Sequence, residues 1–147
     1  MIKTNKDNLV IQSVQGKISS PATGNNPYRI APEGLDHILP ATGGICYNVK
    51  VGDSCMKWVG DHIEPGVSIK NDNTPDNKAL MLLACIGNEA QVITGNAKGA
   101  KGFVTGMHGG VEYTLIEFGD EDLEYMAFGD TILVKAYGQG LAIEGYE

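Results

Sequence analysis

The sequence predicts a mainly β fold, either a partly open β-barrel or a sandwich of short, mostly antiparallel strands. Three observations support this prediction. The chain has 147 residues, the size of one domain, and 42% of them are hydrophobic. Twenty residues are glycine, about twice the usual share, which favours tight turns over long helices. Short apolar or alternating runs are separated by turn residues roughly every 8–12 positions, as in all-β sandwiches and barrels.

The N-terminal third predicts two strands separated by a long loop. Residues 8–14 are rich in apolar and β-branched side chains, and Gln15–Gly16 indicates a turn after them. Residues 20–43 hold four prolines and three glycines, so we expect a long irregular loop. Loops of this length in a compact domain are usually functional or interfacial. Residues 44–51 alternate apolar and polar side chains, which is typical of a half-buried strand, and residues 56–60 suit another short strand.

The middle of the chain predicts a β-hairpin. Pro65–Gly66 indicates a turn, and residues 71–78 are polar enough for a solvated loop. Residues 79–86 form the most apolar run; its Ala, Leu and Met residues also suit a helix. Because Gly87–Asn88 ends this run and residues 91–94 follow at once, we predict two strands joined by a turn at Gly87–Asn88.

The C-terminal third predicts strand, helix and strand. Residues 111–118 alternate as a strand does. Residues 120–128 predict the one short helix, since Asp120 can cap it and acidic side chains suit a helix N-terminus. The β-branched residues in 130–137 predict a strand, and residues 141–143 a last short one. We expect one β-rich domain over the whole chain.

Charge and cysteine content exclude several classes of protein. The net charge is −7 and the eleven lysines and arginines are spread along the chain, which argues against nucleic-acid binding and against anionic membranes. No apolar run approaches the ~18 residues of a membrane span. Three cysteines without a CxxC pair, and no apolar segment after the N-terminal lysines, predict a cytoplasmic protein with reduced thiols.

His62 and Glu64 form the first candidate site. They are two residues apart, so they share one face of an extended chain. A histidine and a carboxylate on one face can hold a metal or act as an oriented acid–base pair. The alternative is a polar loop in which these charges have no role. Asp36 and His37, in the long loop, form a weaker candidate.

The glycine-rich residues 95–110 form the second candidate site, together with His108. Glycines allow backbone N–H groups to face an anion, and lysines add positive charge. The alternative is a glycine-rich hairpin at a tight corner of a barrel, and the sequence leaves this choice open. The candidate ligand-binding residues are Lys98, Lys101, Gly102 and Gly109.

These candidates lead to two hypotheses about function. If the loops that carry the histidines meet at one end of a barrel, His62, Glu64 and His108 would be catalytic, and His62 and His108 could bind a divalent metal. The first hypothesis is therefore a binding or enzymatic site for a small molecule, either an anionic ligand or a metal, and whether the protein is an enzyme stays open. The second is a non-catalytic assembly module, with residues 20–43 packing in a homo-oligomer or against a second domain.

Three stretches of the sequence resemble a known family. They are residues 60–68 (GDHIEPGVS), the glycine-rich residues 95–110, and residues 129–140 (GDTILVKAYGQG). These stretches resemble the N-terminal domain of a prokaryotic family, domain of unknown function 4438. The resemblance extends over nearly the whole chain. The resemblance implies a mostly β domain from a bacterium or an archaeon, and it implies no reaction. Family members continue into a second domain, so we expect either a stand-alone version or the N-terminal half of a longer protein.

Overall fold

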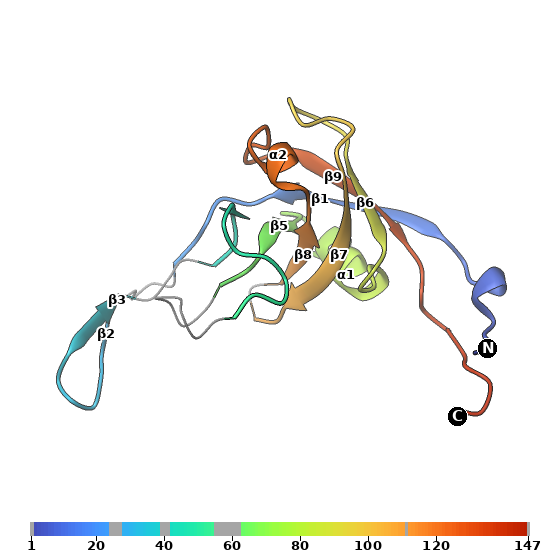
Figure 1. The fold of residues 1–147 in the computed structure, drawn as a ribbon, viewed down its shortest axis with the longest axis horizontal. Coiled ribbons are helices and arrows are strands. Elements are labelled where there is room, and N and C mark those ends of the chain that lie inside the picture. Colours follow the sequence, from blue (N-terminus) through green and yellow to red (C-terminus); the bar gives the residue numbers. More distant parts are fainter. Residues whose placement is uncertain (1, 24–27, 39–41, 55–62, 111, 147) are drawn as a thin grey trace.

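Six antiparallel strands close into a β-barrel in this computed structural model, which describes residues 2–23, 28–38, 42–54, 63–110 and 112–146 (Figure 1). The barrel order is β1-β9-β6-β7-β8-β5, and β5 pairs again with β1 to complete the circle. The barrel strands are β1 (Gln12–Ile18), β5 (Gly66–Lys70), β6 (Glu89–Val92), β7 (Lys101–His108), β8 (Tyr113–Glu117) and β9 (Thr131–Ala136). This confirms the mainly β, antiparallel fold predicted from the sequence, and of the two architectures left open, barrel or sandwich, the structure has the barrel.

A seventh strand, β4 (Ile45–Cys46), adds to the barrel. It pairs with the first half of β5, whereas β1 pairs with the second half. The predicted strand over residues 44–51 is therefore much shorter than expected. Residues 56–60, predicted as another strand, lie outside the described residues.

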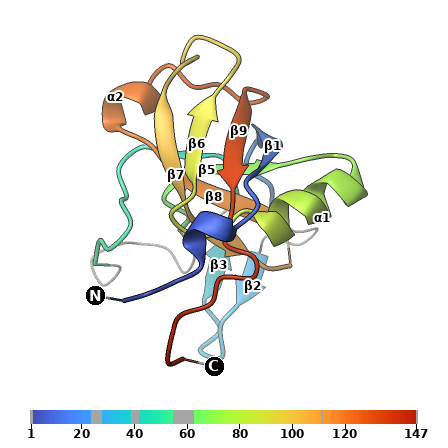
Figure 2. The ribbon, with the colours of Figure 1, turned by 90° about the vertical axis from the view of Figure 1, so that its right-hand side faces the viewer.

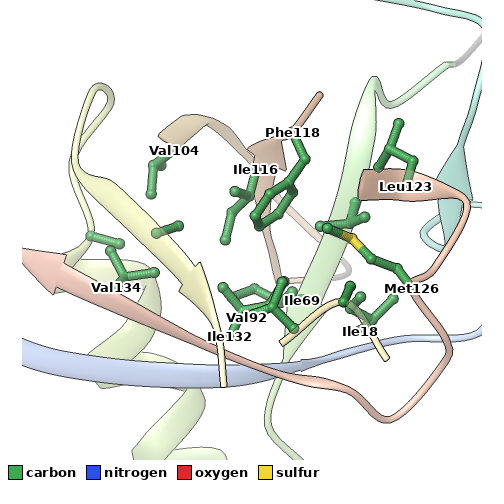
Figure 3. Packing of buried hydrophobic residues seen from close by; sticks show 14 of the residues in the cluster. Ile18, Ile69, Val92, Val104, Ile116, Phe118, Leu123, Met126, Ile132 and Val134 are labelled. Carbon is green, nitrogen blue, oxygen red and sulfur yellow. The ribbon is translucent and has the colours of Figure 1, made fainter. Parts of the chain in front are cut away.

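The core fills the inside of the barrel with aliphatic side chains (Figure 3). Inward positions alternate with outward ones along each strand, so Val67 and Ile69 of β5 are completely buried on the inner face. The same period places Ile132 and Val134 of β9 inside. Residues at the intervening positions face outward, and this alternation decides where the candidate site can lie.

Two predicted turns in fact lie within barrel strands. Gly16 is inside β1, where an added Cβ would be 2.8 Å from a methyl carbon of Leu80. Gly66, after Pro65, begins β5 instead of turning the chain away. In both places glycine permits close packing within the barrel and does not mark a turn.

The predicted hairpin around Gly87–Asn88 is wrong in its first half, because α1 (Thr74–Leu83) occupies this region. Asn73 caps the helix by accepting the Asp76 N–H, so the polar residues predicted as a loop form its first turns. Leu80 is fully buried in the core, and α1 packs against β1 (Figure 2). Burial of one apolar side of a helix outweighed the strand-like length of the run.

The one helix that was predicted, over residues 120–128, is shorter than expected. α2 spans Asp120–Leu123 and begins after Gly119, with no side-chain cap from Asp120. A single 3-10 turn, η1 (Lys6–Asn8), precedes β1. The strand predicted over residues 8–14 begins later than expected, at Gln12, and continues to Ile18. None of the described helices is both long and apolar enough to span a membrane.

The loop predicted over residues 20–43 contains a small hairpin instead of irregular chain throughout. β2 (Tyr28–Ile30) pairs with β3 (Asp36–Ile38), and Figure 1 shows this hairpin extending away from the barrel. Ala22 and Thr42 bridge its base through reciprocal N–H to O=C bonds of 2.9 Å. The strands form because Pro32 lies in the turn, where a missing N–H costs nothing.

Candidate functional site

The candidate site lies on the outer face of β5, β8 and β7. Direct partners across neighbouring strands have their side chains on one face, and His108 is the direct partner of Tyr113. Ser68 is likewise the partner of Leu115, one position along β8 from core-facing Ile116. Tyr113 is 2% exposed although it lies outside the barrel's core cluster. A second layer of chain therefore covers this outer face.

A β-bulge brings His108 to this face. Val104 pairs with Ile116 and points into the core, and the register then shifts so that Gly106 pairs with Leu115. Without the extra residue, His108 would share the inner face with Val104, because a shift of one residue reverses the face of every later side chain. The bulge is what places an imidazole outside the barrel.

Glu64 is the centre of the polar contacts at this site. It lies two residues before the start of β5, and its side chain is 4% exposed. Its Oε2 accepts the Gly43 N–H at 2.7 Å and the Ser68 hydroxyl at 2.8 Å. Its Oε1 lies 3.7 Å from Nε2 of His108, whose side chain is 22% exposed. The carboxylate is thus held by two donors, and the imidazole beside it is reachable from solvent.

Tyr113 forms the floor beneath these groups. Gly43 packs on its ring so closely that an added Cβ would be 3.0 Å from the ring carbon Cζ, and Gly43 has a φ of +89°. Nζ of Lys70 also lies 5.2 Å from the ring centroid, within the range of a cation–π interaction. Cationic, aromatic, carboxylate and imidazole groups therefore meet on one outer face.

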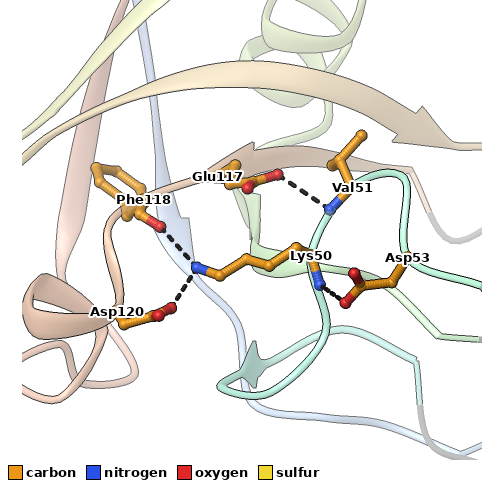
Figure 4. A network of polar contacts seen from close by, with 6 residues as sticks. All are labelled: Lys50, Val51, Asp53, Glu117, Phe118 and Asp120. Atoms are coloured by element: carbon orange, nitrogen blue, oxygen red, sulfur yellow. Dashed lines mark hydrogen bonds and ion pairs between the residues drawn. The ribbon is translucent and has the colours of Figure 1, made fainter.

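Residues 42–54, which we call the covering segment, lie over this face and are fastened at their far end (Figure 4). Lys50 forms an ion pair with Asp120 and donates to the Phe118 carbonyl at 3.4 Å. The Val51 N–H donates to the Glu117 carboxylate at 3.2 Å. These contacts join the covering segment to the end of β8 and the start of α2.

The Lys50–Asp120 pair predicts a pH-dependent contribution to stability. The hydrogen bond to Asp120 raises the pKa of Lys50 above 10.5. Protonated Lys50 therefore contributes fully below the pKa of the unfolded chain, and the contribution is lost as pH rises through the folded pKa. We expect Lys50→Met to cost about 0.5 kcal/mol at neutral pH, the scale of a surface pair. In urea unfolding, the free energy of unfolding of Lys50→Met should differ from that of the wild type by a constant amount up to about pH 9. The difference should become smaller above the lysine pKa. Asp120→Asn should remove this pH dependence. If the stability difference between Lys50→Met and the wild type already shrank near neutral pH, the pH dependence could not come from the Lys50–Asp120 pair.

The structure brings together part of the predicted site. Glu64 and His108, 44 positions apart in the sequence, are neighbours. His62 lies outside the described residues, and His37 is on β3 of the hairpin. Gly109 is in the turn directly after His108.

The predicted lysines lie elsewhere. Lys101 begins β7 and His108 ends it, so the two are about 23 Å apart along the strand. Lys98 is exposed in the turn before β7. Lys101 and Gly102 line a different cavity of about 160 Å³, shared with Gln91, Leu133 and Lys135. The glycine-rich run therefore does not place its lysines beside its histidine.

Gly102 has a packing role in addition. A Cβ at this position would be 2.2 Å from the Glu117 carbonyl oxygen, so β7 can approach β8 only without a side chain there. This contact favours the tight-packing explanation of the glycine-rich run over a loop that cradles an anion.

Sequence reasoning missed Gly43, Ser68, Lys70 and Tyr113. Tyr113 looked like an ordinary member of an alternating run and Ser68 like part of a turn, and Lys70 belonged to no predicted element. Only the register across β5, β8 and β7 shows that they share a face. The one available signal was the even spacing of Glu64 and Ser68, whose side chains meet across the start of β5 at Gly66.

Glu64 and His108 alone supply fewer ligands than a metal ion usually has in a protein. Zinc sites use about three to four protein ligands, and here Glu64 and His108 supply two. Within the described ranges no group of three His, Cys, Asp or Glu side chains could hold a metal ion. The predicted second histidine ligand, His62, is outside those ranges.

Comparison with known proteins gives a family and a fold. Residues 28–147 match the family model described as "Domain of unknown function (DUF4438), N-terminal". A solved structure, "Crystal structure of TM1086", is 52% identical with a TM-score of 0.87; the match covers 95% of this chain and 49% of that chain. The chain thus spans about half the length of that protein. No curated protein matches. Since the family model covers most of the sequence, the chain belongs to the DUF4438 family and corresponds to its N-terminal domain.

Proposed function

We propose that the outer-face cluster around Glu64 and His108 is a small-molecule binding site in which His108 transfers a proton. The observation that carries this proposal is the buried Glu64 carboxylate, fixed by Gly43 and Ser68 and lying 3.7 Å from the imidazole. Burying a carboxylate is costly, so the surrounding donors and His108 must compensate for it.

The roles follow from the contacts. Glu64 lies beside the imidazole and orients it, as carboxylates do for catalytic histidines. His108 is the more exposed of the two, so it is the group that meets a ligand. Ser68 and the Gly43 N–H hold Glu64 in place and act as positioning groups.

Ligand screening tests this proposal. A panel of small carboxylic acids, sugar phosphates and nucleosides is screened by thermal shift, and the dissociation constant of each hit is measured by calorimetry. We expect His108→Ala and Glu64→Gln to weaken binding at least tenfold, about 1.4 kcal/mol. Lys101→Gln, at the far end of β7, should leave affinity unchanged. Equal binding by wild type and His108→Ala, in folded protein, would refute the site.

Metal content separates two chemistries of this site. Stoichiometric zinc in the purified protein that is lost in both His62→Ala and His108→Ala would make His108 a metal ligand. Retention of ligand binding without metal would leave it as the proton-transfer group.

A second candidate function, assembly, has its own supporting observation. The β2–β3 hairpin extends from the barrel with large apolar side chains exposed: Tyr28 by 61%, Ile30 by 78% and Leu35 by 63%. Exposed apolar patches on a projecting element are typical of contacts between chains. We propose a second copy of this chain as the partner.

Sedimentation velocity tests the assembly function. We expect an oligomer for the wild-type chain and dissociation in Ile30→Asp, because a charge replaces an exposed apolar contact. Leu82→Asp, which adds the same charge to an exposed position of α1, is the control and should remain associated. A monomeric wild type would rule out self-assembly through the hairpin.

A further inference from the structure

The barrel closes at the β1–β5 seam, its shortest strand pairing. Lys17 pairs with Lys70 and Ile18 with Ile69, and the Ser19 N–H adds a 3.0 Å bond to the Ser68 carbonyl. The two isoleucines are buried in the core. By alternation, both lysines face outward, directly opposite each other.

Two like charges stand opposite each other at this closure. Directly opposed residues in an antiparallel pair have Cβ atoms about 4.5–5.5 Å apart, and like charges there are destabilising. Lys3, Lys50 and Lys135 each pair with a carboxylate, whereas no described carboxylate lies within ion-pair distance of Lys17 or Lys70. Nζ of Lys70 lies over the Tyr113 ring, on the outer face and on the β8 side of β5, so it must turn from this ring toward the seam to share an anion with Lys17. The seam therefore concentrates positive charge on a chain whose net charge is −7.

We propose that Lys17 and Lys70 bind the phosphate or carboxylate group of a small molecule across the β1–β5 seam. Both ammonium groups can donate hydrogen bonds to the same anion. The anion then removes the repulsion between the two lysines and links the two strands. Binding is thereby coupled to closure of the barrel, because opening the seam separates the two lysines. This site shares Lys70 with the outer face described above, but it requires neither Glu64 nor His108.

Thermal unfolding with inorganic phosphate and, separately, malonate tests the proposal, with chloride keeping the ionic strength constant. A ligand that binds only the folded state raises the Tm of the protein. We expect the Tm to rise by about 3 °C at tens of millimolar phosphate. Lys17→Glu turns the repulsive pair into an attractive one. It should raise the Tm in chloride by about 2 °C and abolish the increment from phosphate. The stronger of the two anions identifies the ligand group.

Control variants and amide chemical shifts show where on the protein phosphate acts to raise the Tm. Lys98→Gln removes an exposed lysine far from the seam and should keep the full increment. His108→Ala should also keep it, which separates this site from the Glu64–His108 centre. In nuclear magnetic resonance spectra, phosphate should shift the amides of Lys17 and Lys70. No Tm increment over chloride, an undiminished increment in Lys17→Glu, or shifts confined to the cavity lined by Lys101 and Lys135 would overturn the proposal.

Discussion

Gly66→Ala is expected to destabilise the barrel by about 3 kcal/mol, because two costs coincide at this position. Gly66 has a φ of +72°, which side chains rarely adopt, and an added Cβ would be 2.2 Å from the Ile116 carbonyl oxygen. That oxygen belongs to the backbone of β8, so it cannot move aside as the end of a side chain could. Urea unfolding followed by circular dichroism measures the loss.

Gly129→Ala separates the two costs. Gly129 has a φ of +90° with nothing within 4 Å of its added Cβ, so it pays for backbone conformation alone, about 1 kcal/mol. Equal losses for the two variants would show that the close approach of β5 to β8 costs nothing. Because Glu64 lies just before β5, Gly66→Ala should also weaken binding at the proposed site.

Glu64→Ala is expected to cost about 2–4 kcal/mol, although it removes a charge and adds no bulk. The Gly43 N–H and the Ser68 hydroxyl both donate to this carboxylate at a buried position. Truncation leaves both donors without their acceptor, and a buried unsatisfied donor costs about 1–3 kcal/mol. Glu64→Gln keeps an oxygen for one of them and should cost about 1 kcal/mol.

The control for this prediction is Glu89→Ala. Glu89 is an exposed carboxylate paired with Lys135 at 3.4 Å, so its loss should cost at most about 1 kcal/mol. The amide resonance of Gly43 should move in both Glu64 variants, since it reports the hydrogen bond directly. A Glu64→Ala variant as stable as Glu89→Ala would mean that Glu64 does not organise this face.

Local patterns predicted the strands whose alternation is clear. Residues 111–118 and 130–137 became β8 and β9 with small changes at their ends, since one buried face imposes a period of two. Residues 79–86 misled the prediction, because a short apolar run suits a strand and a buried helix equally. The cap at Asn73 was the missing signal, and it lay in residues that resembled a loop.

Composition and alternation were enough to predict a glycine-rich, mainly antiparallel β fold, either a barrel or a sandwich, because both act locally along the chain. The β1–β5 pairing decided that the fold is a barrel. The sequence also singled out Glu64 and His108 as chemically suitable residues. Their meeting was decided by tertiary structure: the bulge after Val104 puts His108 outside the barrel, and the β5–β8–β7 register sets Tyr113 beside it. The opposition of Lys17 and Lys70 likewise exists only because the barrel closes between β1 and β5. Register depends on pairings between distant segments, and no local pattern encodes it.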